Sequence, residues 1–311
     1  MADFQHTTVM VNECLEALAP ALQGRDKVFV DATLGLGGHT ESIVQSFDNV
    51  RVIAIDRDQE ALERSKVRLA GWNHQIDFVH ADFDELEDIL ATRSIQGIDG
   101  ILFDLGVSSM QLDDETRGFS YHQDARLDMR MDASQELSAY EVVNSYEADE
   151  LEKVLFEFGE EKYAKKIVAA IVKHRPVTTT GELVDVIKGA LPAFVLRKSG
   201  HPARKSFQAI RIEVNQELEQ LRRVLQMAVE RLNPSGRILV LTYHSLEDRI
   251  VKNLFRKLSS SPHPIDLPIQ VQPPAYFLVY SGGLEPTDDE VNLNPRSRSA
   301  RLRVLAAREA A

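Results

Sequence analysis

Residues 27–40 read KVFVDATLGLGGHT, and this stretch decides the fold. An apolar run over residues 28–30 ends at Asp31, and three glycines follow before a segment with helical spacing. A short buried strand, a glycine-rich loop and a helix in that order are typical of the first unit of a doubly wound α/β sheet. Such a loop leaves the amides at the start of the helix free to bind a ligand.

Further apolar runs of strand length occur at residues 51–56, 75–80, 98–104 and 237–242. Strands that are almost continuously apolar and alternate with helices predict a parallel sheet covered on both faces. Near the C-terminus, the apolar segments 276–281 and 300–306 predict an antiparallel hairpin. The expected fold class is therefore α/β, with a doubly wound, mostly parallel sheet that ends in an antiparallel hairpin.

The connection between the strands at 98–104 and 237–242 is far longer than the roughly 20 to 30 residues that one helix needs. Its sequence is charged and helical, so we expect an inserted all-helical domain over residues 113–202. Residues 1–112 and 203–311 then form the α/β domain, and a single long amphipathic helix is expected over 206–232. Because the insert starts where a parallel strand ends, we expect it to cover the active site and to recognise the substrate.

Composition excludes several classes of protein. Hydrophobic residues make up 43% of the 311 residues, which is enough for a substantial core. No apolar run approaches the roughly 20 residues that cross a bilayer, and the N-terminus shows no secretion signal. The single cysteine, Cys14, cannot form an intramolecular disulfide and is a poor zinc ligand without partners. We expect a cytoplasmic protein with no metal site and no membrane contact.

The net charge of −12 argues against a protein that coats nucleic acid, because neutralising phosphates requires cations on the contact face. Local basic surfaces are still possible. Two clusters of cationic residues stand out in the sequence: Arg197, Lys198, His201, Arg204, Lys205 and Arg211, and then Arg296, Arg298, Arg301 and Arg303. These clusters either balance nearby acids or contact RNA, and composition alone leaves both possibilities open.

Three expected strands end in acids or are followed by them, at Asp31, Asp56 and Asp82. A pyrophosphate would be repelled by these carboxylates, whereas a cationic sulfonium nucleoside would be attracted. Asp56 stands 18 residues after Gly38, a suitable distance to accept hydrogen bonds from ribose hydroxyls. Thr40 occupies the position where a dinucleotide-binding loop has its third glycine. Acids can also simply terminate strands, and that alternative stays open.

The strand at 98–104 ends at Asp104, where this fold brings the cofactor and its target together. The amine of a base such as cytosine is a poor nucleophile, so a carboxylate that binds its protons would activate it. Asp104 is the candidate for this role or for holding the cofactor. Tyr243, His244 and Ser245 follow the next strand and could bind an unpaired or flipped base, and Phe83 is placed to contact an adenine.

Several motifs together are specific. The longest are LDMRMD at residues 127–132 and HSLEDR at residues 244–249. Shorter ones occur at residues 6–9, 35–39, 54–58, 104–113, 117–120, 158–161, 201–203, 207–209 and 294–296. On these motifs, which cover nearly the whole chain, the sequence resembles the RsmH (MraW) family, the 16S rRNA (cytosine(1402)-N4)-methyltransferases.

The resemblance implies a class I methyltransferase domain with an inserted helical domain, using S-adenosyl-L-methionine (SAM). It implies a bacterial, cytoplasmic enzyme that methylates N4 of cytidine 1402 in the decoding region of 16S rRNA. The acidic net charge suggests in addition that the enzyme acts on an assembled small ribosomal subunit and not on naked RNA. The cofactor-binding positions that carry over are Gly37, Gly38, His39, Asp56, Phe83, Asp104 and Gln111. For catalysis we expect Asp104, assisted by His244 and Ser245. The chain departs from the family pattern at Met110, commonly proline, and at Tyr243, commonly phenylalanine.

Three alternatives from other functional classes remain open. A SAM-dependent methyltransferase could act on another RNA base or on an acceptor that is not RNA, with the same cofactor site. A dehydrogenase would share the glycine loop, but it predicts a glycine in place of Thr40. A non-enzymatic RNA-binding or ribosome-assembly protein would not need the glycine loop, Asp56 and Asp104 together. The oligomeric state is left open.

Overall fold

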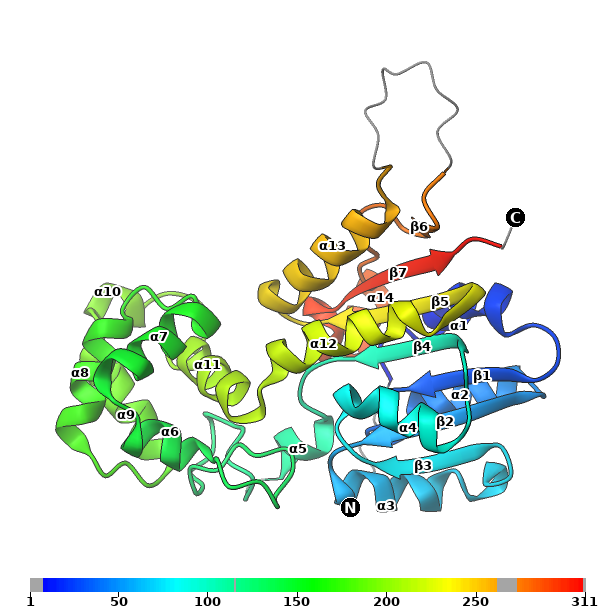
Figure 1. The fold of residues 1–311 in the computed structure, drawn as a ribbon. Helices are drawn as coiled ribbons and strands as arrows, with labels where there is room; N and C mark the ends of the chain where they lie inside the picture. The colour runs from blue at the N-terminus through cyan, green and yellow to red at the C-terminus, as the bar shows by residue number, and fades with distance from the viewer. Residues whose placement is uncertain (1–7, 115, 262–272, 310–311) are drawn as a thin grey trace. The chain divides into compact units, whose positions relative to one another are not determined.

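The computed structural model describes residues 8–114, 116–261 and 273–309. The chain divides into two compact units: Met1–Gly106 with Leu218–Ala311, and Val107–Glu217. The first unit holds the whole sheet, and the second is helical (Figure 1). His6 and Thr7, part of the motif at residues 6–9, lie outside the described residues.

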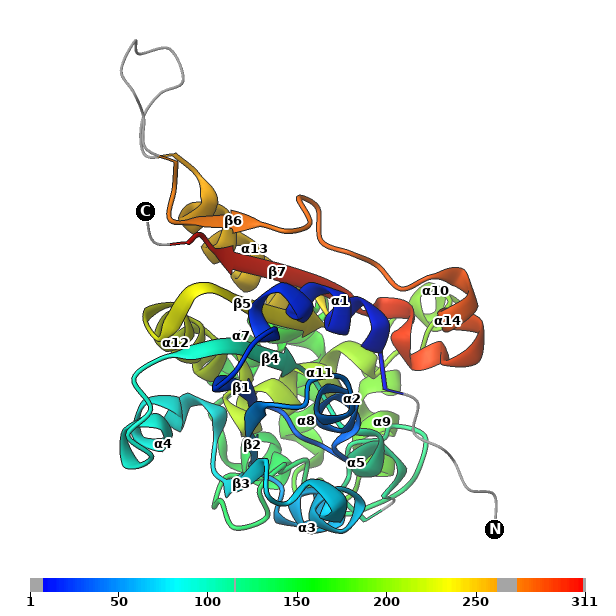
Figure 2. The ribbon, with the colours of Figure 1, turned by 90° about the vertical axis from the view of Figure 1, so that its right-hand side faces the viewer.

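The first unit is built on one seven-stranded sheet with the order β3-β2-β1-β4-β5-β7-β6 (Figure 2). The strands are β1 Lys27–Asp31, β2 Val50–Asp56, β3 Ile76–His80, β4 Ile98–Asp104, β5 Leu232–Thr242, β6 Tyr276–Leu278 and β7 Arg301–Ala307. Strands β1 to β5 are parallel to one another, while β7 runs antiparallel to both β5 and β6. The predicted doubly wound sheet with a C-terminal antiparallel hairpin is confirmed.

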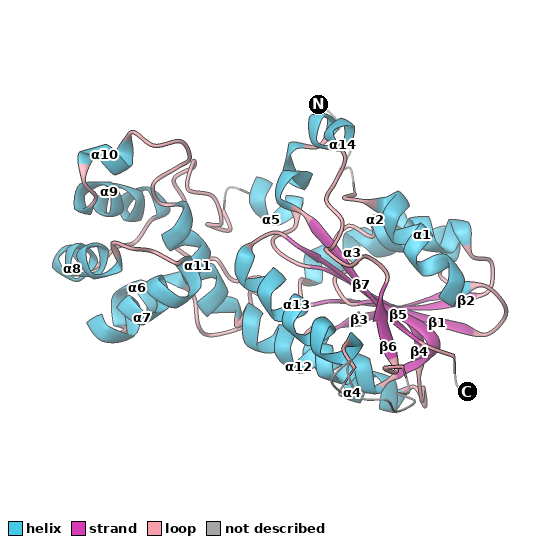
Figure 3. Ribbon diagram, turned by 90° about the horizontal axis from the view of Figure 1, so that it is seen from above, coloured by secondary structure: helices cyan, strands magenta, loops and turns pink. Residues whose placement is uncertain are grey.

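Helices cover both faces of the sheet (Figure 3). Consecutive residues of β2 show why: Val52 and Ala54 pack into the core on one face, and Ile53 and Ile55 into the core on the other, because strand side chains alternate. The first face carries α1 Val11–Leu22, α2 Gly38–Ser46 and α3 Gln59–Arg68, and the second carries α4 Leu86–Thr92, α12 Glu217–Glu230 and α13 Ser245–Ser259. The short helices are η1 Ala70–Trp72, η2 Phe83–Glu85, α14 Asp288–Leu293 and η3 Pro295–Ser299.

Strand β5 begins earlier than the sequence predicts. Its first residue, Leu232, pairs with Ile98, and the register then shifts so that Gly100 pairs with Arg237. The residues between form an irregularity in the strand, with Ser235 in the left-handed region at φ 64°. Proline and glycine at residues 234 and 236 are typical of a turn outside a sheet, but here they mark a bulge within it.

The second unit is a helical domain with its own apolar core. Its helices are α5 Ser109–Asp113, α6 Ala139–Ser145, α7 Ala148–Gly159, α8 Ala164–His174, α9 Thr180–Ala190, α10 Ala193–Leu196 and α11 Arg204–Asn215. Thr179 caps α9, accepting a hydrogen bond from the backbone amide of Glu182. The unit extends past the expected range 113–202, because Phe207 and Ile210 of α11 are buried in the helical core.

The expected single helix over residues 206–232 is wrong. The structure contains two helices, α11 and α12, separated by Gln216 in the left-handed conformation at φ 50°. One residue in that conformation ends a helix. The apolar stripe continues through both helices, and that continuity concealed the break.

Asn215, the last residue of α11, explains where the helical unit closes. Its buried side-chain amide accepts a hydrogen bond from Met131 N at 2.8 Å and donates to Met129 O at 2.8 Å. The same amide donates to Arg211 O at 2.9 Å. One side chain therefore joins the end of the unit to the loop carrying the LDMRMD motif near its beginning.

Among the helices of the described ranges, none has the length and apolar character to span a bilayer.

Replacing this amide should destabilise the helical unit. Asn215→Ala leaves the Met131 N–H and the Met129 carbonyl buried without their partner, so we expect a loss of about 3 kcal/mol in the free energy of unfolding. Urea denaturation followed by circular dichroism measures the loss. The exposed neighbour provides the control, since Gln216→Ala removes no buried hydrogen bond and should shift the midpoint little. Equal midpoints for the two variants would contradict this role for Asn215.

Candidate active site

The register of the parallel strands brings the predicted acids to one edge of the sheet. Asp31, the last residue of β1, pairs with Ala54 of β2 and with Leu102 of β4. Two residues further along those neighbouring strands lie Asp56 and Asp104. The carboxyl ends of parallel strands are where doubly wound sheets bind ligands.

The glycine-rich loop after β1 is held by the carboxylate of Asp56. Gly35 N donates to Asp56 Oδ2 at 2.6 Å, and Asp58 N donates to Asp56 Oδ1 at 2.8 Å. On the other side of the loop, Ser65 Oγ donates to Gly35 O at 2.6 Å. Gly35 and Gly37 have φ values of 52° and 77°, which favour glycine. The loop is thus fixed by contacts within the protein, before any ligand binds.

Close packing also excludes larger residues from this loop. A Cβ on Gly37 would lie 2.8 Å from Leu69 Cδ1, and a Cβ on Gly38 would lie 1.9 Å from Thr8 Oγ1. The backbone at the start of α2 therefore packs directly against the side chains of Leu69 and Thr8. His39, the second residue of α2, is consequently buried, with 6% of its surface exposed.

Asp31 stabilises the two ends of the glycine-rich loop through hydrogen bonds. Its carboxylate accepts hydrogen bonds from Thr40 Oγ1 at 2.7 Å and from Thr33 N at 3.3 Å. Burial raises the pKa of Asp31, and these two hydrogen bonds oppose the rise. Thr40, where a dinucleotide-binding loop has glycine, is thus needed for its hydroxyl, which ties α2 to the end of β1.

Asp104 lies between a tyrosine and a histidine. The Tyr243 hydroxyl donates to Asp104 Oδ1 at 2.7 Å, and His39 Nε2 lies 3.7 Å from Asp104 Oδ2. Burial, with the Asp104 charge as the next cause, raises the pKa of Tyr243 well above its ordinary value, so the hydroxyl keeps its proton. Within the described residues, His39 Nε2 is buried and makes no hydrogen bond. An acceptor oxygen and a donor nitrogen are therefore held side by side at the end of β4.

Phe83 follows β3 and stands edge-on to Phe103, with ring centroids 6.0 Å apart and planes at 87°. The preceding acid is fixed by two side chains. Arg57 Nε lies 2.8 Å from Asp82 Oδ1, and Gln220 Nε2 donates to Asp82 Oδ2 at 3.2 Å. These contacts connect the ends of β2 and β3 to α12 and fix the loop that carries the Phe83 ring.

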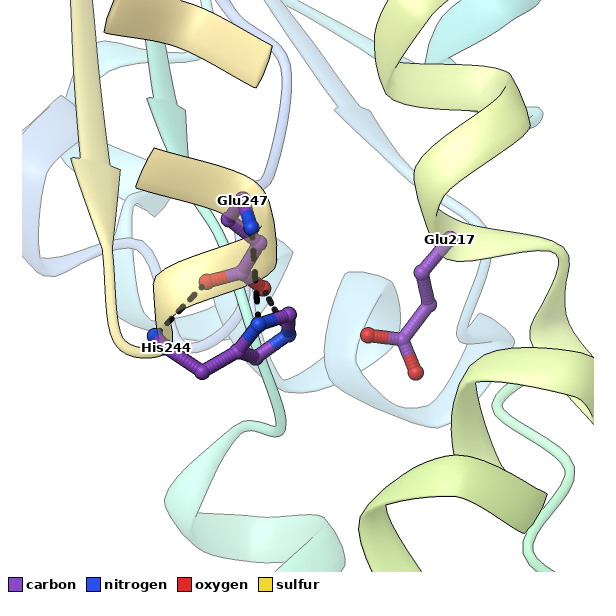
Figure 4. Close-up of side chains that lie close together, drawn as sticks. All are labelled: Glu217, His244 and Glu247. Carbon is purple, nitrogen blue, oxygen red and sulfur yellow. Dashed lines mark hydrogen bonds and ion pairs between the residues drawn. The ribbon is translucent and has the colours of Figure 1, made fainter. Parts of the chain in front are cut away.

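His244 caps α13. Its Nδ1 accepts a hydrogen bond from Glu247 N at 3.4 Å, and its Nε2 lies 3.0 Å from Glu247 Oε1 (Figure 4). The other carboxylate oxygen, Glu247 Oε2, accepts from Tyr243 N at 2.8 Å and from His244 N at 3.2 Å. Glu247 is buried, with 2% of its surface exposed. Both ring nitrogens of His244 thus face one residue of its own helix, which fixes the end of β5.

A hollow of about 330 Å³ opens beside this turn. Its walls include Tyr243, His244 and Ser245 after β5, with Asp248 from α13 and Arg301 from the start of β7. Ser245 is exposed, as a residue that contacts a substrate must be. The hollow lies at the carboxyl end of β5, at the edge of the sheet that also carries Asp104.

Gln111 belongs to the helical unit. It forms a capping box at the start of α5, in which Gln111 N donates to Ser108 Oγ at 3.2 Å and Ser108 N donates to Gln111 Oε1 at 3.1 Å. Its side chain is buried. The neighbouring Met110, a departure from the family pattern, is part of the same short helix.

The structure therefore brings most of the predicted site residues to one edge of the first unit. These residues are Gly37, Gly38, His39, Asp56, Phe83, Asp104, His244 and Ser245. Nothing in the sequence singles out Gln220, because a glutamine on an amphipathic helix gives no local signal. The sequence predicts a base contact for Tyr243 and gives no sign of its hydrogen bond to Asp104.

The sheet order, the single antiparallel strand beside β5 and the glycine loop after β1 define a class I SAM-dependent methyltransferase. Comparison with known proteins narrows this class. A sequence model of the MraW methylase family matches residues 3–308, and the chain belongs to that family.

Curated relatives agree over nearly the full length. The chain is similar to proteins from three bacteria that are named "Ribosomal RNA small subunit methyltransferase H". The Thermobifida fusca protein is 48% identical, covering 96% of this chain and 92% of its own. The Kocuria rhizophila protein is 45% identical, covering 98% and 94%, and the protein of a Nocardioides species is 46% identical, covering 98% and 97%.

Removing the Tyr243 hydroxyl tests the arrangement at Asp104. Tyr243→Phe leaves the ring in place and takes the donor from Asp104 Oδ1, so the carboxylate is no longer held in one orientation. A hydrogen bond to a charged group contributes about 1.5 kcal/mol, which corresponds to roughly a tenfold fall in kcat. We expect the KM for SAM to change less than kcat.

Steady-state methyl transfer measures both constants. Tyr276→Phe on β6 is the matched control, since it removes a tyrosine hydroxyl that donates to Val229 O of α12. That control should keep the kcat of the unmodified protein. If Tyr243→Phe also kept it, the hydroxyl would have no role in holding Asp104.

Asp56 should make cofactor binding depend on pH. Burial raises the pKa of Asp56 to about 6, against the opposing hydrogen bonds from Asp58 N and Gly35 N. The carboxylate is ionised and a strong acceptor above that pH, and it becomes protonated below it. We expect the affinity for SAM to fall by about fourfold between pH 7.5 and pH 5.5. Calorimetry across that range measures the fall, and Asp56→Asn should bind more weakly with no such dependence. An equal slope in the variant would exclude Asp56 as its cause.

Proposed function

We propose that this protein transfers the methyl group of SAM to the exocyclic N4 of cytidine 1402 in the decoding region of 16S rRNA, acting on an assembled small ribosomal subunit. Its family and the names of its relatives support a small-subunit rRNA substrate. The observation that carries the chemistry is Asp104, with one carboxylate oxygen bound by Tyr243 and the other beside His39.

The residues at the sheet edge fit the cofactor. His39 Nε2 is a buried donor without a hydrogen bond to any described residue, and Asp104 Oδ2 is an acceptor 3.7 Å away. His39 Nε2 can donate to the carboxylate at the methionine end of the cofactor, and Asp104 Oδ2 beside it is left for the target amine. Asp56 would accept hydrogen bonds from the ribose, and Phe83 would contact the adenine. Gly37 and Gly38 allow the backbone to approach. When bound, SAM supplies an electrophilic methyl carbon on a sulfonium that leaves as a neutral thioether.

Asp104 is proposed to activate the target amine. The lone pair of an amino group on cytosine is delocalised into the ring, which makes the nitrogen a weak nucleophile. A carboxylate that accepts a hydrogen bond from the amine N–H favours a tetrahedral nitrogen and takes the proton that the nitrogen loses as the new N–C bond forms. The Tyr243 hydroxyl holds Oδ1, which leaves Oδ2 as the oxygen that accepts the amine proton.

His244 and Ser245 are proposed to hold the base. Both nitrogens of the His244 ring face Glu247, so the ring is fixed and serves better as a surface for the base than as a proton acceptor. The exposed Ser245 lines the same hollow and can donate or accept a hydrogen bond with the base. The target cytidine must leave its stack to reach these groups.

The first experiment supplies labelled SAM to small subunits from a strain that lacks the modification and identifies the labelled nucleoside by mass. We expect N4-methylated cytidine at position 1402, and little label in a short free RNA hairpin. Label on another nucleotide would redirect the proposal to a different RNA base. Efficient methylation of the hairpin would remove the requirement for an assembled subunit.

Asp104→Asn tests the catalytic assignment. The amide keeps the shape of the side chain but loses the charge, and we expect kcat to fall by about 100-fold. Calorimetry with S-adenosylhomocysteine in parallel reports whether the variant still binds cofactor. A fall in affinity with unchanged kcat would assign Asp104 to the methionine end of the cofactor alone.

A further inference from the structure

The helical unit contains a basic stretch in a chain that is otherwise acidic. Residues 186–212 include six lysines and arginines and no aspartate or glutamate, although the net charge of the protein is −12. Several of these cations are exposed, including Lys188 at the end of α9, Arg197 and Lys198 after α10, and Arg204 at the start of α11. Among the described residues, Arg197 and Arg204 form no ion pair.

Aromatic rings gather at the same part of the helical unit. Tyr121 stacks on His201 with centroids 4.5 Å apart and planes only 13° from parallel. The exposed His122 contacts both rings, with centroids 4.6 Å from Tyr121 and 5.4 Å from His201. Beneath them, the buried Phe207 meets Tyr121 edge-on at 5.8 Å. We call Tyr121, His122 and His201 the ring platform.

The platform is rigid on its basic side. His201 Nδ1 accepts a hydrogen bond from Ala203 N at 3.3 Å, which fixes the plane of the imidazole. Burial lowers the pKa of His201, and the nearby Lys188 and His122 lower it further, so the ring is neutral near pH 7. His201 therefore contributes an aromatic face, and the charge is supplied by the lysines and arginines around it.

Asp124, the acid nearest to the ring platform along the chain, binds the start of α9. Asp124 Oδ1 accepts a hydrogen bond from Gly181 N at 3.0 Å, at the start of α9, and further bonding with Thr179 helps to lower the pKa of Asp124. On the basic side, Phe194 of α10 is 55% exposed, and Lys198 Nζ lies 5.9 Å from the centre of its ring. The exposed Phe194 and the half-buried His201 thus alternate with cations over residues 188–204.

We propose that the ring platform and its flanking cations bind unpaired nucleotides of the ribosomal RNA substrate other than the reacting base. The inference rests on the proposed rRNA methyltransferase function and names the surface of the helical unit that holds the RNA. Bases stack on the exposed rings, and Lys188, Arg197, Lys198 and Arg204 contact the phosphates between them.

The composition of this surface favours RNA over other partners. Single-stranded RNA is recognised by aromatic side chains that stack on its bases, together with cations that follow its backbone. The core of a protein–protein interface is depleted of charged residues, lysine among them, whereas lysines and arginines separate the rings here. Stacking on an aromatic ring is open to every base, so the platform adds affinity without selecting a particular base.

Two pairs of variants test the rings and the charges separately. His201→Ala and His122→Ala remove platform rings, while Tyr121→Phe keeps its ring and serves as their control. Arg197→Ala with Arg204→Ala removes two cations, and Lys153→Ala with Lys173→Ala removes two exposed lysines of the same unit outside residues 186–212. Thermal melts verify that every variant is folded.

The measurement is the KM for unmethylated small subunits, together with kcat and the affinity for S-adenosylhomocysteine. We expect each ring deletion to raise this KM by about tenfold, with kcat and cofactor affinity unchanged. The arginine pair should raise it similarly and lower the salt dependence of binding by about one unit in the logarithmic slope. Neither control should move it.

Direct binding of a labelled single-stranded oligoribonucleotide is measured in parallel. If the protein binds this probe through the platform but methylates no small-subunit RNA, the proposed function fails and the platform stands. If the ring and arginine variants match their controls in both KM and probe binding, the platform is overturned, whatever the outcome for methylation.

Discussion

The carboxylate of Asp56 holds the active-site end of the first unit together. It accepts the Gly35 amide from the glycine loop and the Asp58 amide from the turn after its own strand. Without this acceptor, the loop after β1 would keep the bond from Leu34 N to Ile55 O of β2 at 2.9 Å, but the amide of the left-handed Gly35 would lose its partner. The placement of α2, and with it His39, depends on that loop. A group expected to bind ribose is therefore also the one that builds the binding loop.

Much of this edge could be predicted from sequence because its signals are local. The apolar runs of β1, β2 and β4 each end in an acid, and the glycines of the loop stand directly after β1. The C-terminal hairpin was also recognisable from two apolar segments. Such patterns depend on strand length and the alternation of two buried faces, and they need no knowledge of distant contacts.

Other features depend on contacts that are distant in sequence or leave no local pattern. Gln216 breaks a helix although it is neither glycine nor proline, and the apolar stripe continues across it. The Tyr243 hydroxyl reaches Asp104 only because β5 lies beside β4. The sequence around His244 is compatible with a catalytic residue and with a helix cap, and its contacts with Glu247 are seen only in the structure. Its part in catalysis stays a prediction.

The Asn215 amide has a consequence for the order in which the chain is made. Strand β4 leaves the ribosome with one edge open, and its partner β5 is synthesised only after the whole helical unit. An open apolar strand edge invites pairing with other chains. Once α11 is complete, the bonds from Asn215 to Met129 and Met131 close the helical unit on itself. That closure shortens the effective loop that β5 must span to reach β4. A closed insert thus leaves a shorter flexible segment between β4 and β5 than their separation in the sequence implies.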